Sequence, residues 1–197
     1  GLIDDIEGAG GKAFGYSCDA TQEDQVVALI DRIEDEVGPI EVACYNAAVG
    51  AAHSITDFPA ETYERVWRIN TFGAFLMGRE VSRRMVERGR GTILFTGASA
   101  SVKGYPNSSS FAMGKFGLRG LAQSMARELQ PKNIHVAHFV IDGGIALLDG
   151  ADKRAAARGP DGTLDPDAIA QSYLQIHRQH RSAWTWEIEL RPWVEKF

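Results

Sequence analysis

Apolar segments of strand length alternate along this chain with segments of helix length, and this alternation limits the possible folds. Strand-like segments occur at 40–46, 91–97 and 133–142, and each is bounded by glycine or polar residues. The segments between them carry apolar side chains at helical spacing. Strands that are joined through helices form right-handed crossovers and a parallel sheet covered on both faces. The chain is therefore predicted to be an α/β protein with a doubly wound parallel sheet in three layers.

The remaining segments complete this prediction. A short N-terminal helix ends at Gly8, and 146–165 is a polar loop region. The segment 184–190 alternates between apolar and polar residues, which is typical of a strand near a sheet edge. The other predicted elements are a strand at 12–18 and helices at 21–38, 60–90, 108–129 and 166–180. No repeat or second domain is indicated, so a single domain is expected over 1–197.

Composition excludes several classes of partner. The formal net charge of -5 leaves no basic surface for nucleic acid or anionic lipid, so small molecules are the expected partners. No apolar run is long enough to span a membrane. Only Cys18 and Cys44 are present, too few for a disulfide scaffold, and a cytoplasmic location is expected.

The five histidines do not form a metal-binding pattern. His135 and His138 are three apart on a predicted strand and point to opposite faces. His177 and His180 can share a helix face, but no cluster of acidic or cysteine residues accompanies them. No metal site is predicted.

Lys115 is the residue that calls for a functional explanation. It lies in SSSFAMGKFGLRG (108–120), on a helical stripe of apolar side chains. A lysine on such a stripe, with no acidic residue four positions before or after it, needs another polar partner. The alternative is a lysine whose aliphatic stem covers apolar surface while its ammonium reaches water.

Several short motifs follow one another in a characteristic order. They are YNAA at 45–48, Asn70 within a helix, TGASAS at 96–101, Phe111 four residues before Lys115, and a strand that ends in DGG at 142–144. In this order the chain resembles the short-chain dehydrogenase/reductase family, from the third strand of its dinucleotide-binding fold to the C-terminus. The resemblance implies a Rossmann-type fold, an NAD or NADP cofactor and hydride transfer to or from a small carbonyl or alcohol substrate.

The resemblance assigns cofactor contacts residue by residue. Asp19 matches the acidic residue that binds the adenine amino group, although an Asp that leads into a helix is an equally good interpretation. Asn46, Ala47 and Ala48 match the segment that lines the adenosine side of the cofactor; the alternative is a simple strand end.

Two further assignments concern the nicotinamide end. Lys115 matches the lysine that binds the nicotinamide ribose, and Asn70 matches the catalytic asparagine. A buried amide must find hydrogen bonds, so Asn70 either serves a water relay or links two helices. Gly143 and Ile145 follow the strand end, where the family contacts the nicotinamide carboxamide, and 146–165 corresponds to the substrate lid.

The chain departs from the family where protons are handled. Phe111 stands at the position of the catalytic tyrosine, and Ala98 at that of the catalytic serine. Phenylalanine cannot donate a proton, and general acid catalysis contributes roughly 10² to 10⁴-fold to the rate. Ser99 and Tyr105 are the nearest replacements by position, although a turn serine and a loop aromatic are the simpler interpretations.

The glycine-rich phosphate turn of the family is not found in this sequence. The glycines of GAGGKAFG (8–15) precede a predicted strand, whereas a phosphate loop follows a strand and opens a helix. We expect the sequence to be an N-terminally truncated part of a longer protein, lacking the first two strands of the family fold. The charge that separates NAD from NADP is then also absent.

The sequence is consistent with two functional hypotheses. The first is an NAD(P)-dependent oxidoreductase of the short-chain type with an atypical proton donor. The second is a catalytically silent family member that binds a nucleotide or serves as a partner subunit. Lys115 and Asn70 favour the enzyme, whereas Phe111 and Ala98 favour the silent member. The alternating C-terminal strand and the small residues of the helix around Lys115 predict a homodimer or homotetramer.

Overall fold

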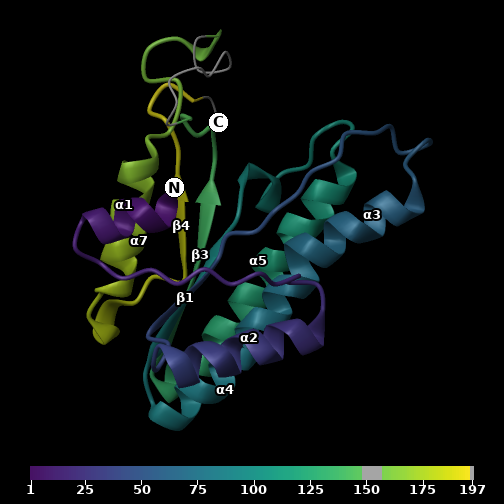
Figure 1. The fold of residues 1–197 in the computed structure, drawn as a ribbon. Helices are drawn as coiled ribbons and strands as arrows, with labels where there is room; N and C mark the ends of the chain where they lie inside the picture. Colours follow the sequence, from purple (N-terminus) through teal and green to yellow (C-terminus); the bar gives the residue numbers. More distant parts are fainter. Residues whose placement is uncertain (148–156, 196–197) are drawn as a thin grey trace.

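The computed structural model describes residues 1–147 and 157–195 of the chain. Its centre is a parallel sheet with the strand order β1-β2-β3-β4. The strands are β1 (Val42–Tyr45), β2 (Gly91–Thr96), β3 (Ile134–Ile141) and β4 (Glu187–Leu190). The predicted α/β parallel sheet is confirmed, and β4 lies at a sheet edge, as its alternating sequence indicated (Figure 1).

Helices cover both faces of the sheet and create two apolar cores. The helices are α1 (Leu2–Gly8), α2 (Glu23–Glu36), α3 (Ala60–Trp67), α4 (Gly73–Arg88), α5 (Ser109–Leu129) and α7 (Pro166–His177). The larger core joins α2, α4 and α5 to one face, with Leu76, Phe95 and Leu118 at its centre. The smaller core packs Ile176 and Tyr173 of α7 against Phe139 on the other face.

Strand β3 is the most deeply buried element of the fold. All of its residues are buried, because it is paired on both sides and covered on both faces. This explains why IHVAHFVI has no alternation of apolar and polar positions. Two histidines lie within this buried strand, and both need partners inside the protein.

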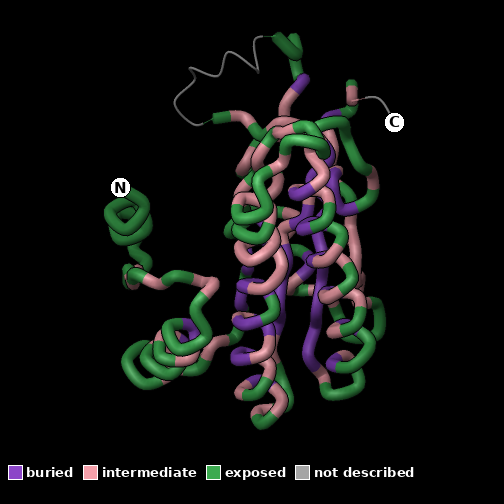
Figure 2. The backbone as a smooth tube through the Cα atoms, turned by 90° about the vertical axis from the view of Figure 1, so that its right-hand side faces the viewer, coloured by how far each residue is buried: buried purple, intermediate pink, exposed green. Residues whose placement is uncertain are grey.

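The predicted strand at 12–18 is wrong. Residues 11–19 have no ladder hydrogen bonds, and α1 stands apart from the body of the molecule with no buried residue (Figure 2). Phe14 remains 56% exposed. In the described parts of the chain no strand pairs with the outer edge of β1, and a strand cannot form without a neighbour that satisfies its backbone groups.

The predicted helix at 60–90 is interrupted. A π-helical turn, Arg68–Phe72, separates α3 from α4. Tyr45, at the end of β1, donates a hydrogen bond to the Ile69 carbonyl inside this wider turn, at 2.6 Å. Insertions of this kind occur frequently at functional sites. Here the turn carries Asn70, one of the two residues that the sequence placed in the site.

Candidate active site

Lys115 lies on the buried face of α5 and is only 2% exposed. Its ammonium donates a hydrogen bond to the carbonyl of Thr96, the last residue of β2, at 2.7 Å. Thr96 is the only hydrogen-bond partner that Lys115 has among the described residues. An ammonium has three N–H donors, so two of them are free for a ligand. The structure therefore places Lys115 beside the carboxyl end of the sheet, where ligands of open α/β folds bind.

The surroundings of Lys115 weaken its charge. Burial lowers the pKa of its ammonium to about 8, because a charged group is less stable away from water. The Thr96 carbonyl compensates only in part, since no carboxylate lies against the ammonium within the residues that the structure describes. With a pKa of about 8 the ammonium stays mostly protonated at neutral pH, and a pKa displaced in this way is common at functional sites.

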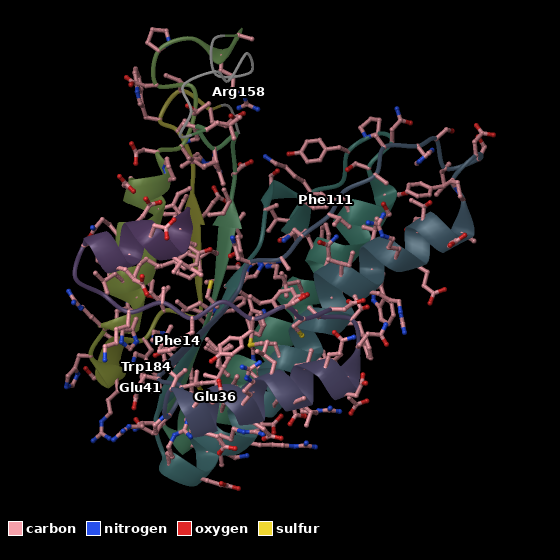
Figure 3. The ribbon with its side chains drawn as sticks, viewed as in Figure 1. Phe14, Glu36, Glu41, Phe111, Arg158 and Trp184 are labelled. Atoms are coloured by element: carbon pink, nitrogen blue, oxygen red, sulfur yellow. The ribbon has the colours of Figure 1, made fainter. Side chains whose placement is uncertain are left out.

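Phe111 lies one helical turn before Lys115 on α5. The Lys115 ammonium is 5.8 Å from the centre of the Phe111 ring. The ring also lies close to Gly50, in the loop that follows β1. Figure 3 shows Phe111 toward the end of the molecule to which the strands point, whereas Trp184 and Glu41 lie toward the opposite end. Phe111 therefore shares the strand-end region with Lys115 but offers no proton to a ligand.

Asn70 is completely buried in the π-helical turn. Its side-chain amide nitrogen donates to the Val49 carbonyl at 2.8 Å, and its amide oxygen accepts from the Val49 N–H at 3.1 Å. The backbone of Gly114 on α5 lies so close that an added Cβ there would overlap the Asn70 side chain. Asn70 thus joins the turn to the loop after β1, and this contact places that loop relative to α5.

The turn after β2 contains Ala98, at the position of the family's catalytic serine, and Ser99 beside it. The Ala98 N–H donates to Ser101 Oγ at 3.1 Å, and the Ser101 N–H donates to the Ala98 carbonyl at 2.8 Å. Ser99 opens the short 3-10 turn Ser99–Ser101 and is partly exposed. The turn is therefore held closed by its own polar groups, and Ser99 retains access to solvent.

A second lysine lies at the same end of the sheet. Lys103 donates to the carboxylate of Asp142 at 3.1 Å, and Asp142 is 4% exposed at the end of β3. This hydrogen bond, together with a contact to the Tyr105 hydroxyl, raises the pKa of Lys103. Tyr105 itself is 44% exposed. Sequence reasoning missed this group; a carboxylate at the end of a buried strand was the signal that a cation had to be near.

The remaining residues assigned to a cofactor differ in their surroundings. Asp19 is exposed, and its carboxylate accepts from the N–H and the hydroxyl of Thr21; these hydrogen bonds lower its pKa. Asn46, Ala47 and Ala48 are exposed at the end of β1. Gly143 follows β3, and Ile145 forms a bridge with Leu164.

Two further observations concern the proposed lid and other types of ligand. The predicted lid at 146–165 lies in part outside the described residues. Within residues 1–147 and 157–195, no cluster of three histidine, cysteine, aspartate or glutamate side chains is arranged to hold a metal ion. None of the helices in this part of the chain is both long and apolar enough to cross a bilayer.

Known proteins share both the sequence pattern and the fold. Residues 2–146 match the family model described as short chain dehydrogenase. A short-chain dehydrogenase from Rhodopseudomonas palustris has 38% identity and a TM-score of 0.82, over 98% of this chain and 80% of that structure. A gluconate 5-dehydrogenase from Burkholderia cenocepacia, solved with NADP and tartrate, has a TM-score of 0.85 over 97% of this chain and 78% of its own. At 21% identity, this second structure shows the fold alone.

A curated relative gives the same result for the sequence. The 3-oxoacyl-acyl-carrier-protein reductase MabA of Mycobacterium bovis is 34% identical over 132 residues. The match covers 67% of this chain and 53% of the reductase. The chain thus spans about half the length of the curated relatives it matches.

Proposed function

The chain belongs to the short-chain dehydrogenase/reductase family, and from this premise we propose that it transfers a hydride between NAD or NADP and a small carbonyl or alcohol substrate. The observation that carries the proposal is the buried Lys115 ammonium at the carboxyl end of the sheet, which among residues 1–147 and 157–195 has one neutral partner and two donors left over. A stable core does not require such a group, whereas a ribose with two hydroxyls is a suitable ligand for it.

The residues present fit the nicotinamide side of a dinucleotide. Lys115 would bind the ribose, Gly143 and Ile145 would line the carboxamide side, and the exposed backbone of 46–48 would border the adenosine side. Asp19 is a further candidate for the adenine end. The glycine-rich turn that cradles the pyrophosphate in this family does not occur within these 197 residues. When bound, the nicotinamide supplies or accepts the hydride.

Proton transfer in this site needs a donor other than the residue at the tyrosine position. Phe111 and Ala98 have no exchangeable side-chain proton. Tyr105 has a hydroxyl in contact with the Lys103 side chain, and Lys103 is itself held by the Asp142 carboxylate. We therefore assign Tyr105, supported by Lys103 and Asp142, as the replacement donor, with Ser99 as the second candidate.

A silent, nucleotide-binding member is the second candidate function. It is favoured by Phe111, whose ring takes the place of the family's hydroxyl and lies against Gly50. A partner subunit of this type would bind the dinucleotide without turnover. The homo-oligomer and the cytoplasmic location stay predictions under either hypothesis.

The test is nucleotide titration of the full-length protein, followed by a hydride-transfer screen with aldehydes, ketones and alcohols. Lys115→Ala is compared with Lys132→Ala, a half-exposed lysine just past α5. We expect Lys115→Ala to weaken nucleotide binding and to reduce turnover about tenfold or more, with Lys132→Ala unchanged. Failure of the unaltered protein to bind either nucleotide would contradict both candidate functions.

Two further variants separate the candidates. Tyr105→Phe removes the assigned donor and should lower turnover by about 10² while nucleotide binding is retained. The double change Phe111→Tyr, Ala98→Ser restores the side chains of the family. Turnover that appears only in this double variant would support the silent member and argue against Tyr105.

A further inference from the structure

A chain of buried and partly buried polar side chains runs beneath the turn that follows β2. His138 on β3 is completely buried, and its Nδ1 lies 3.0 Å from Glu187 Oε2 on β4. Its Nε2 lies 3.4 Å from Ser101 Oγ. Glu187 in turn accepts two hydrogen bonds from the guanidinium of Arg119 on α5, at 2.6 and 2.7 Å.

The partners determine where each proton lies. Burial alone would raise the pKa of Glu187, but Arg119 outweighs this effect and holds the pKa below its usual value, so the carboxylate is ionised. It can then only accept, and the Nδ1 of His138 must carry the proton. Burial also lowers the pKa of His138 to about 4, which leaves the ring neutral and its Nε2 an acceptor for the Ser101 hydroxyl.

The order of serine, histidine and carboxylate resembles that of a hydrolytic triad, but a nucleophile is excluded here. Ser101 and His138 are both 0% exposed, so no acyl substrate can reach the hydroxyl. Ser101 Oγ also accepts a hydrogen bond from the Ala98 N–H. The Ser101 hydroxyl therefore links the His138 ring to the backbone of the turn through two hydrogen bonds.

Shape adds to these hydrogen bonds. Gly97 lies directly against the ring of His138, and an added Cβ at this position would overlap Nε2. The Gly97 N–H donates to the Phe139 carbonyl of β3 at 2.7 Å. The turn is therefore held to β3 at two points, through the Gly97 N–H and through the hydrogen bond between Ser101 and His138.

We propose that Arg119, Glu187, His138 and Ser101 form a positioning chain that fixes the 97–101 turn, and with it Ala98 and Ser99, against the substrate. None of the four is a catalytic residue, since each acts through the turn. Arg119 lies one helical turn after Lys115, so the chain also connects the turn to the helix that carries Lys115. This inference rests on the proposed function for its effect on turnover.

Charged groups face the imidazole from two elements, and these set its protonation. Glu187 on β4 favours the charged ring, whereas Arg119 and Lys115 on α5 both disfavour it. Because the His138 ring is neutral, it does not repel the nearby Lys115 ammonium. Substitution of His138 by phenylalanine puts a slightly larger apolar ring in the same place and removes both polar connections, to Glu187 and to Ser101.

The experiment uses the full-length protein and three variants. Ser101→Ala removes a single oxygen and should fold normally, while His138→Phe removes the centre of the chain. His135→Phe is the matched control, because His135 is equally buried on the same strand but is stacked on Trp184 and hydrogen-bonded to the Thr185 carbonyl, away from the turn. Amide hydrogen exchange at Ala98, nucleotide affinity, kcat and KM are measured for each.

We expect Ser101→Ala to speed exchange of the Ala98 amide by about 3–10-fold, because that N–H loses its acceptor. The kcat of Ser101→Ala and His138→Phe should fall by about 10–100-fold, with nucleotide affinity within twofold. His135→Phe should change neither exchange at Ala98 nor kcat. Equal exchange in Ser101→Ala and the unaltered protein, or an equal loss of kcat in His135→Phe, would overturn the inference.

The outcome also separates this inference from the proposed function. If the unaltered protein binds no nucleotide, the proposed function fails, and any role in turnover fails with it. Faster Ala98 exchange in Ser101→Ala would still establish the chain as the structural support of the turn. Normal nucleotide binding and turnover with unchanged variants would instead overturn the chain alone.

Discussion

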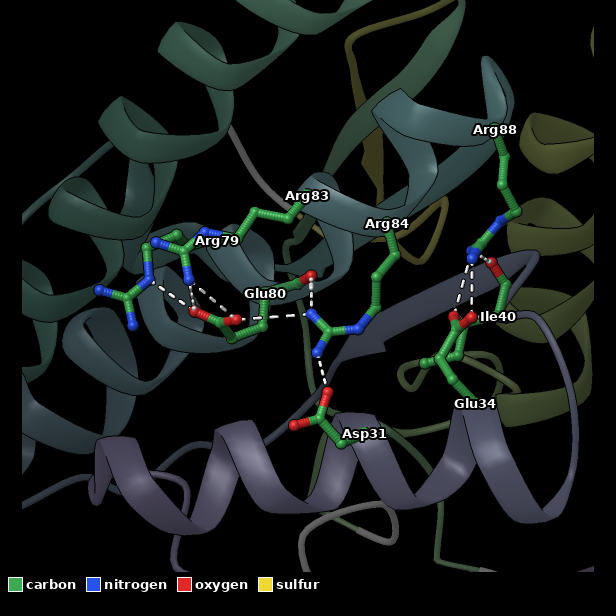
Figure 4. Close-up of polar contacts among 8 residues, drawn as sticks. All are labelled: Asp31, Glu34, Ile40, Arg79, Glu80, Arg83, Arg84 and Arg88. Atoms are coloured by element: carbon green, nitrogen blue, oxygen red, sulfur yellow. Dashed lines mark hydrogen bonds and ion pairs between the residues drawn. The ribbon is translucent and has the colours of Figure 1, made fainter.

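Two buried charges, Glu80 on α4 and Lys115 on α5, have the same 2% exposure but opposite surroundings. Glu80 receives hydrogen bonds from three guanidinium groups of its own helix, at 2.8–3.4 Å. In the described part of the chain, Lys115 donates to a single carbonyl, that of Thr96. Figure 4 shows how the arginines around Glu80 continue to α2, where Arg84 pairs with Asp31 and Arg88 with Glu34.

The pKa values follow this difference. Burial alone would raise the pKa of Glu80, but the arginines outweigh it and hold the pKa below its ordinary value. Burial lowers the pKa of Lys115 to about 8 with no opposing charge. A buried charge with all its partners stabilises the fold, whereas a buried charge with spare donors is costly unless a ligand completes it. Glu80 therefore lies in a face whose charges are paired, whereas Lys115 lies at the sheet edge where we propose that the nucleotide binds.

The largest effect is expected from Glu80→Ala. Removing the carboxylate leaves three guanidinium groups without their common partner, and breaking a buried ion pair costs about 3–5 kcal/mol. Urea unfolding should show this loss, with nucleotide binding unchanged in the folded fraction. Glu87→Ala, an exposed glutamate on the same helix, is the control and should stay within about 0.5 kcal/mol. Similar losses in the two variants would mean that the arginine cluster contributes nothing specific.

The second prediction concerns the pH dependence of Lys115→Met. The pKa of Lys115 is about 8 in the folded protein, against the ordinary 10.5, so between these values the unfolded chain binds more protons. The free energy of unfolding should therefore rise with pH in this window, by about 2 kcal/mol between pH 7.5 and 10. Lys115→Met should lose this rise. If the free energy of unfolding had the same pH dependence in both proteins, the pKa of Lys115 would not be lowered by burial, and the prediction would be wrong.

Asn70 lies between these extremes, since both ends of its amide are used by Val49. Asn70→Ala leaves one N–H and one carbonyl of Val49 without their partners, and we expect a loss of about 1–2 kcal/mol in the free energy of unfolding. If Asn70 also positions the loop after β1 in the site, turnover should fall by more than the loss of folded protein accounts for. Ser82→Ala, which removes a hydroxyl bonded to the Gly78 carbonyl on α4, is the control and should leave turnover unchanged.

The positions of Lys115 and Asn70 could be predicted because helical spacing is local. A polar residue on an apolar stripe is visible in the sequence, and both residues are buried as that spacing indicated. Their partners could not be predicted in the same way. Thr96 and Val49 contribute backbone groups, which every residue type offers. The roles that the family resemblance assigns to both residues stay predictions.

Non-local pairing accounts for the remaining differences. The segment 12–18 has the composition of a strand, but a strand also needs a neighbour, and none lies beside it among the described residues. His138 and Glu187 are 49 positions apart on neighbouring strands, so no sequence window contains both. The break in the predicted helix at 60–90 depends likewise on Tyr45, which reaches Ile69 from β1.

The smallest effect is expected from Arg32→Ala on α2, because this arginine belongs to an exposed ion pair. Arg32 pairs with Glu36 at 2.8 Å, but both side chains are about half exposed, and water screens the pair. Such i,i+4 pairs contribute about 0.3–0.5 kcal/mol, and salt reduces this further. In urea unfolding at low and at high salt, the free energy of unfolding of Arg32→Ala should therefore lie within about 0.5 kcal/mol of that of the unaltered protein. A loss comparable to that of Glu80→Ala would show that the number of ion pairs, and not their burial, determines the stability of this face.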